Sequence, residues 1–165
     1  MKDLQKYFQQ GLIFVNGYGI KAGDIRKVET NSTSKRWGQA TQKYDVFGKK
    51  YYTIQIAEKL LSDEVEDKHL MSTIVHEILH TVDGCMTHKG KWKVLADEIT
   101  RTSDLVIKRV TSAEEKNINV QEAYKYVCRC DKCGYEIGKE RMSQFIKYPN
   151  LYTHRNCGGH FTRIK

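Results

Sequence analysis

Residues 76–80 read His-Glu-Ile-Leu-His in a segment that is otherwise mostly apolar. Side chains four positions apart on a helix lie on the same face, so the two imidazoles would lie one above the other. The flanking residues that would bury this helix are Ile74, Val75, Ile78 and Leu79. Because buried His and Glu side chains without partners are costly, the segment predicts a buried helix, about residues 64–83, at a metal centre.

The chemistry of this trio is specific. His76 and His80 can both bind one zinc ion at about 2.0–2.1 Å. Glu77 lies beside the metal but is not a ligand, so it can act as general base toward a water molecule whose pKa zinc lowers to about 7. The same carboxyl group can then pass the proton to a leaving amine. The pattern therefore predicts hydrolysis of an amide or peptide bond.

A catalytic zinc needs three protein ligands and one open position, and two residues compete for the third place. His88 follows Gly84, so a chain reversal after the helix would bring it back to the metal. Glu98 lies on the next expected helix, about residues 89–103, where it would otherwise be a neighbour of the site or a surface carboxylate. The glycine turn favours His88.

The remaining N-terminal part predicts one helix and three strands. A helix is expected over residues 2–15, and strands over 25–30, 35–42 and 51–57. In the third strand, apolar and polar side chains alternate, as in a sheet with one buried face. Ser62 with Asp63 predicts the start of the histidine helix and Gly84 its end. The expected fold is α+β, with a small sheet packed on helices that carry the zinc site.

The C-terminal segment predicts a second, smaller zinc site. Cys130-x-x-Cys133-Gly134 and His154-x-x-Cys157-Gly158-Gly159 have the form of a zinc ribbon, in which four ligands close a structural site. His160 is an alternative fourth ligand, and Cys128 could replace Cys130 or stay free. About 45 residues form too small a core alone, so a metal would stabilise them. We therefore divide the chain into a domain of residues 1–120 and a ribbon of residues 121–165.

Charge and composition bear on partners and location. The net charge is +8, and residues 121–165 carry nine basic and four acidic side chains. Basic residues between aromatic ones are typical of surfaces that bind single-stranded DNA or RNA. The N-terminus has an apolar run of only four residues, Leu12 to Val15, too short for a signal peptide or a membrane span. We expect a cytoplasmic protein without membrane contact, whose five cysteines are reduced.

The segment HEILHTVDGCMTHKGKWKVLADEI resembles the SprT-like metallopeptidase domain, in which a short loop after HExxH leads to a histidine and an aromatic residue, here His88 and Trp92. Asn31-Ser32 and Trp37-Gly38 are similar to another stretch of that family. The glycine after His88 is displaced by one position, and His154 stands where the family usually has cysteine.

The resemblance implies an α+β zinc endopeptidase with a C-terminal ribbon, whose edge strand, within residues 51–57, accepts an extended substrate. Relatives of the Spartan type cleave proteins crosslinked to DNA, which implies protein substrates and single-stranded DNA as partners. Two alternatives stay open. One is a nucleic-acid-binding ribbon protein with a non-proteolytic scaffold, and the other is zinc-dependent hydrolysis of a small amide.

Overall fold

The computed structural model describes residues 1–32, 36–109 and 124–165, and the chain forms two compact units, residues 1–111 and 112–165. The expected boundary at residue 120 lies outside the described part. The α+β class with small sheets and helices is confirmed. Among the described residues, no helix has both the length and the apolar character needed to cross a membrane.

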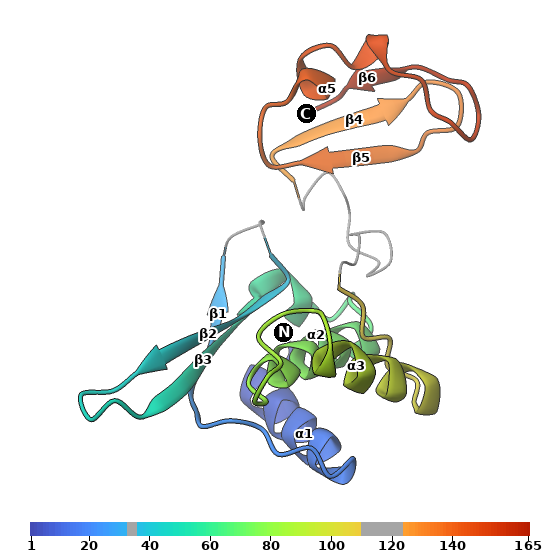
Figure 1. Ribbon diagram of the computed structural model, residues 1–165. Coiled ribbons are helices and arrows are strands. Elements are labelled where there is room, and N and C mark those ends of the chain that lie inside the picture. Colours follow the sequence, from blue (N-terminus) through green and yellow to red (C-terminus); the bar gives the residue numbers. More distant parts are fainter. Residues whose placement is uncertain (33–35, 110–123) are drawn as a thin grey trace. The chain divides into compact units, whose positions relative to one another are not determined.

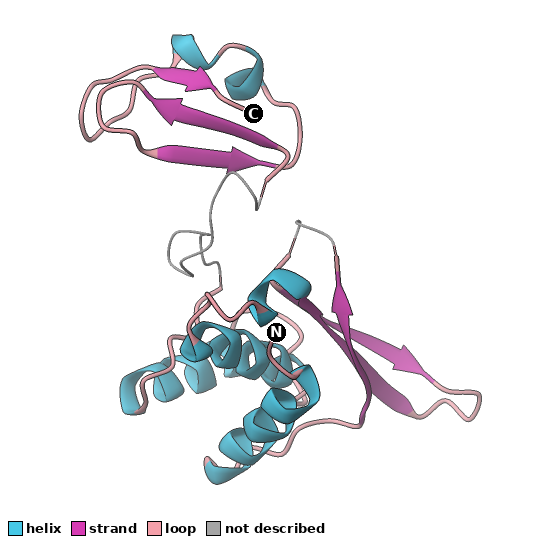
Figure 2. Cartoon of the chain, turned by 180° about the vertical axis from the view of Figure 1, so that it is seen from behind, coloured by secondary structure: helices cyan, strands magenta, loops and turns pink. Residues whose placement is uncertain are grey.

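Over its described residues, the first unit has three α-helices and a three-stranded sheet. In both views the helices gather on one side of the sheet (Figures 1 and 2). The elements are α1 (Leu4–Gly17), β1 (Ile25–Asn31), β2 (Gly38–Tyr44), β3 (Lys50–Ala57), the 3-10 helix η1 (Glu58–Leu61), α2 (Asp67–His80) and α3 (Lys91–Thr102). Asp3 starts α1, because its side chain accepts hydrogen bonds from the N–H groups of Gln5 and Lys6.

The sheet order is β1-β3-β2, with β1 parallel and β2 antiparallel to β3. The expectation that residues 51–57 form an edge strand is therefore wrong, since β3 is central and β2 lies at an edge. Tyr52, Ile54 and Ile56 of β3 are buried as the alternation predicts, and Thr53 on the opposite face is also buried. A strand with a neighbour on each side loses solvent contact along both its edges, which alternation does not reveal.

The α2 helix is shorter than predicted at both ends. It begins at Asp67 and not near residue 64, because the preceding turn is fixed by the N-terminus: the Lys2 N–H donates to the Leu61 carbonyl at 2.7 Å, and the Lys2 ammonium contacts Asp67 at 2.7 Å. The helix ends at His80. Gly84, with φ +79°, belongs to the loop that follows and not to the helix end.

The described residues of the second unit, 124–165, form a small antiparallel sheet and two short helical segments. Its strands β4 (Tyr126–Cys130), β5 (Glu136–Lys139) and β6 (Phe161–Arg163) follow the order β5-β4-β6. The segments α5 (Gln144–Lys147) and η3 (Pro149–Leu151) lie between β5 and β6 in sequence. Cys128, Ile146 and Phe161 form its buried core. This core is small, so the unit needs a further source of stability.

Candidate metal centres

Three imidazoles meet in the first unit, two from α2 and one from the loop after it. The Nε2 atoms of His76, His80 and His88 lie 2.9–3.2 Å from one another. Three nitrogens bound to one tetrahedral zinc at 2.0–2.1 Å would lie about 3.3 Å apart. The three atoms therefore already have nearly the spacing that one zinc ion requires.

The hydrogen bond on the far side of His80 prepares its ring for a metal. Its Nδ1 lies 2.8 Å from the Cys85 carbonyl oxygen, which can only accept, so the proton is on Nδ1 and the Nε2 lone pair is free to bind. Burial lowers the pKa of His80, although its bond to Cys85 acts in the opposite direction. Burial also lowers the pKa of His88. Neutral imidazoles are the form that binds zinc.

The Trp92 ring, on α3, packs against all three histidine rings of the cluster. Its ring centroid lies 4.8 Å from that of His76, 5.4 Å from that of His80 and 4.6 Å from that of His88. The ring is nearly parallel to His80 and crosses the other two at steep angles, and only 3% of the residue is exposed. One buried indole thus limits the motion of all three candidate ligands.

Glu77 lies beside this cluster and not within it. Its Oε1 is 4.0 Å from the His76 Nε2, and Glu77 is not among the residues whose ligand atoms all lie within 4.8 Å of one another. The carboxyl group is close enough to contact a water molecule held at the cluster. The residue is 5% exposed. Burial raises the pKa of Glu77 to about 8, while the Ala40 N–H, which donates to its carboxylate, and the positive charge of Arg36 act to lower it.

The competing third ligand, Glu98, does not join the cluster. It lies on α3 with an exposed side chain. Among the described residues, the side chains close enough together to share a metal ion include His76, His80 and His88 but not Glu98. The loop from Thr81 to Gly90 brings His88 back to the helix. Thr81 anchors the start of that loop, since its hydroxyl donates to the Ile78 carbonyl and accepts from the Gly23 N–H.

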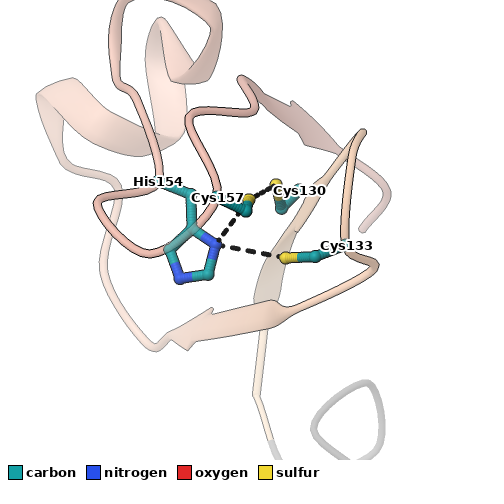
Figure 3. A group of neighbouring side chains, drawn as sticks. All are labelled: Cys130, Cys133, His154 and Cys157. Atoms are coloured by element: carbon teal, nitrogen blue, oxygen red, sulfur yellow. Dashed lines mark hydrogen bonds between the residues drawn. The ribbon is translucent and has the colours of Figure 1, made fainter.

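A second cluster lies in the C-terminal unit. The side chains of Cys130, Cys133, His154 and Cys157 point toward one another, with all four ligand atoms within 4.8 Å (Figure 3). The His154 Nδ1 lies 3.1 Å from the Cys133 sulfur and 3.2 Å from the Cys157 sulfur. The sulfurs of Cys130 and Cys157 are 3.4 Å apart, far beyond a disulfide bond of about 2 Å. These three thiols and one imidazole are compatible with a closed tetrahedral zinc site.

The two turns that carry these residues have the same hydrogen-bond pattern. Gly134 N–H donates to the Cys130 carbonyl, and Gly158 N–H donates to the His154 carbonyl. Both glycines have positive φ, +74° and +70°, which side chains other than glycine rarely adopt. His154 therefore occupies in the second turn the place that Cys130 has in the first. The substitution of histidine for cysteine keeps the position of the ligand and changes only its chemistry.

The alternatives for this second site lie elsewhere in the unit. The His160 Nδ1 lies 3.0 Å from the Asn150 carbonyl oxygen, and the backbone N–H of His160 donates to the Asp131 carboxylate. Cys128 is buried in the core, and burial raises the pKa of its thiol. For Cys130, burial acts to raise the pKa, but the N–H groups of Cys133 and Lys132, together with the thiols of Cys157 and Cys133, prevail and lower it to about 6. A thiolate is thus accessible at Cys130 and disfavoured at Cys128.

Several groups at the first site were not found by sequence reasoning. The Cys85 carbonyl and the Ala40 N–H are backbone groups, and no residue pattern reveals them. Gly38 was noticed only as part of a resemblance, yet it lies directly against the Glu77 side chain. Trp92 was likewise named only as part of the resemblance, which does not show that it contacts the histidines.

Comparison with known proteins adds no further assignment: no family model, curated protein or solved structure matches this chain.

Proposed function

We propose that this protein is a zinc-dependent endopeptidase of the SprT-like kind. The observation that carries the proposal is the position of Glu77, buried, outside the ligand trio and 4.0 Å from the His76 Nε2. A purely structural zinc site has no use for a buried carboxyl group at that distance, because burying it is costly. A hydrolytic site requires a base there.

Each residue then has a defined role. His76, His80 and His88 would hold zinc, which supplies Lewis acidity and a water of lowered pKa. Glu77 takes the proton as water attacks the substrate carbonyl, and it delivers that proton to the leaving nitrogen. The charge of zinc lowers the pKa of Glu77 below its metal-free value of about 8, so the carboxylate is available as base at neutral pH.

The free edge of β2 supports an extended peptide as substrate and not a small amide. Trp37 and Asp45 use their backbone groups on the β3 side, so the intervening even-numbered residues direct their N–H and C=O groups away from the sheet. Ala40 uses its N–H for Glu77, which places the edge directly beside the base. Gln42 and Tyr44, farther along the strand, are free to pair with a substrate strand.

A cleavage assay with matched variants tests this function. Wild type, Glu77→Gln and Glu98→Gln are incubated with casein, and zinc is measured in each. Glu77→Gln should lose about 10²–10⁴ in rate with unchanged zinc content, while Glu98→Gln, the same chemical change at an exposed position, should keep full rate. Equal cleavage by Glu77→Gln and wild type would refute the assigned base, and zinc loss in Glu98→Gln would reopen the choice of third ligand.

We also propose that the C-terminal unit binds single-stranded DNA and directs the peptidase to DNA-associated or DNA-crosslinked proteins. Tyr135, Tyr148 and Tyr152 are 42–53% exposed. Exposed basic side chains lie on the same small unit: Lys132, Lys139, Arg141, Lys147, Arg155, Arg163 and Lys165. Aromatic rings that stack on bases, with cations for the phosphates, suit a single strand.

Fluorescence anisotropy with a labelled oligonucleotide tests the DNA proposal. Tyr148→Ala should weaken binding by about 1–3 kcal/mol if its ring stacks on a base. Tyr44→Ala is the control and should bind as wild type does, since Tyr44 is a tyrosine of the first unit that is 63% exposed, against 53% for Tyr148. DNA binding without casein cleavage would favour the alternative of a nucleic-acid-binding protein with a non-proteolytic scaffold. Cleavage without DNA binding would remove DNA from the proposal.

A further inference from the structure

Gly38, at the start of β2, lies in contact with the side chain of Glu77. A methyl group built on Gly38 would be 2.6 Å from the Glu77 Oε1, 2.7 Å from its Cγ and 2.9 Å from its Cδ. All three distances are below the 3.0 Å that real Cβ contacts essentially never cross. The backbone of Gly38 is an ordinary strand with no positive φ. Glycine is needed here for space and not for conformation.

The neighbouring outward position, Ala40, binds the same side chain. Gly38 pairs with Ile56 and Ala40 with Ile54 in the antiparallel ladder. The Ala57 N–H donates to the Trp37 carbonyl, so odd-numbered residues of β2 face β3 and even-numbered ones face outward. The Ala40 N–H therefore leaves the sheet at its edge, where it donates to the Glu77 carboxylate.

We propose that Gly38 is a positioning residue: its missing side chain, together with the Ala40 N–H, sets the place of the Glu77 carboxyl group beside the histidine cluster. The consequence for catalysis rests on the proposed function, but the contact itself does not. The three atoms nearest to an added methyl group all belong to the Glu77 side chain, and none of them is a backbone atom. The carboxyl group must therefore move by at least 0.4 Å, from 2.6 to 3.0 Å, while the fold persists.

Displacement of a general base by a fraction of an ångström lowers the rate of the chemical step. We expect Gly38→Ala to lower kcat about 10- to 100-fold, with KM and zinc content close to wild type. Gly17→Ala is the matched control, since a methyl group on Gly17 meets nothing within 4 Å, and it should leave kcat unchanged.

Two double-mutant cycles test whether Gly38 acts through Glu77. Glu77→Asp withdraws the carboxylate by one methylene from β2. If the two residues are coupled, the kcat of the double variant Gly38→Ala/Glu77→Asp is higher than the value obtained by multiplying the fold-losses of the two single variants. If Gly38 acts elsewhere in the site, the losses multiply, and the proposal is overturned.

The second cycle measures thermal unfolding and needs no activity. Gly38→Ala should lower Tm in the wild-type background and lose that effect in Glu77→Ala, where the clashing atoms are gone. If Gly38→Ala alone does not fold, recovery of folding in the Glu77→Ala background is the supporting result. An equal Tm loss in both backgrounds overturns the contact. If the Tm cycle shows coupling but the protein does not cleave casein, the proposed function is refuted while the contact between Gly38 and Glu77 is supported.

Discussion

Removal of zinc should expose the cost of burying Glu77. The residue is 5% exposed, and burial raises the pKa of its carboxyl group from 4.5 to about 8. In the metal-free protein, the folded state therefore holds a proton that the unfolded chain has released. A raised pKa in the folded state contributes stability that is complete below about pH 4.5 and is lost as the pH rises through about 8.

The size of the effect follows from the two pKa values. The difference between 4.5 and about 8, at 1.36 kcal/mol per pH unit, corresponds to roughly 5 kcal/mol as an upper bound. Water that enters the site would reduce it. The glutamine side chain in Glu77→Gln is uncharged at every pH, so this variant should not lose stability as the pH rises through about 8. We expect the two metal-free proteins to have similar free energies of unfolding near pH 4.5 and the variant to be more stable near pH 9.

Urea unfolding followed by tryptophan fluorescence measures this difference. The chain's two tryptophans, Trp37 and Trp92, both lie in the first unit, so the signal does not report the ribbon, from which the same chelator would remove a bound metal. Protonation of His80 and His88 at low pH affects both proteins alike and cancels in the comparison. Parallel pH profiles for wild type and Glu77→Gln would refute the reasoning. Restored zinc should shrink the gap, since its charge favours the carboxylate.

Two further variants probe the surroundings of the metal centres. Trp92→Ala should lower the free energy of unfolding by about 3–5 kcal/mol and weaken zinc binding in chelator competition, because the three histidine rings lose the indole they pack against. Unchanged zinc affinity would show that the ring is not needed to hold the ligands. Cys157→Ser should remove one zinc per chain and the dispersed amide signals of residues 124–165, leaving the first site loaded, whereas His160→Ala should change neither; zinc loss in His160→Ala would contradict the ligand set.

The grouping of the candidate ligands was predictable because their spacing is local. His76 and His80 lie one helical turn apart, and two short turns carry the four residues of the ribbon, so each pattern constrains geometry within a few residues. His88 was a choice between two candidates, decided by a glycine that allows the chain to reverse. The structure brings these residues together by short-range means: a helix, a loop of ten residues and two glycine turns.

Long-range contacts explain what the sequence did not predict. Ser62 and Asp63 have the form of a helix start, yet α2 begins at Asp67 because Lys2, more than sixty residues away, holds the preceding turn through Leu61. A local capping preference of about 1 kcal/mol is readily overridden by tertiary contacts. The central place of β3 depends likewise on which strands pair with it, and periodicity reports burial of one face but not the order of strands.

The two metal centres differ in how much of their function a sequence pattern can contain. In the ribbon, the four candidate ligands would make up the whole of a zinc site, and two equivalent turns carry them. At the histidine cluster, the candidate ligands are only half of what the proposed hydrolysis requires. The other half is the placement of Glu77, and it depends on an absent side chain at Gly38 and a backbone N–H at Ala40. A missing side chain and a backbone N–H form no recognisable sequence motif. HExxH therefore points to Glu77 as the proposed base, while the neighbouring strand determines where its carboxyl group lies.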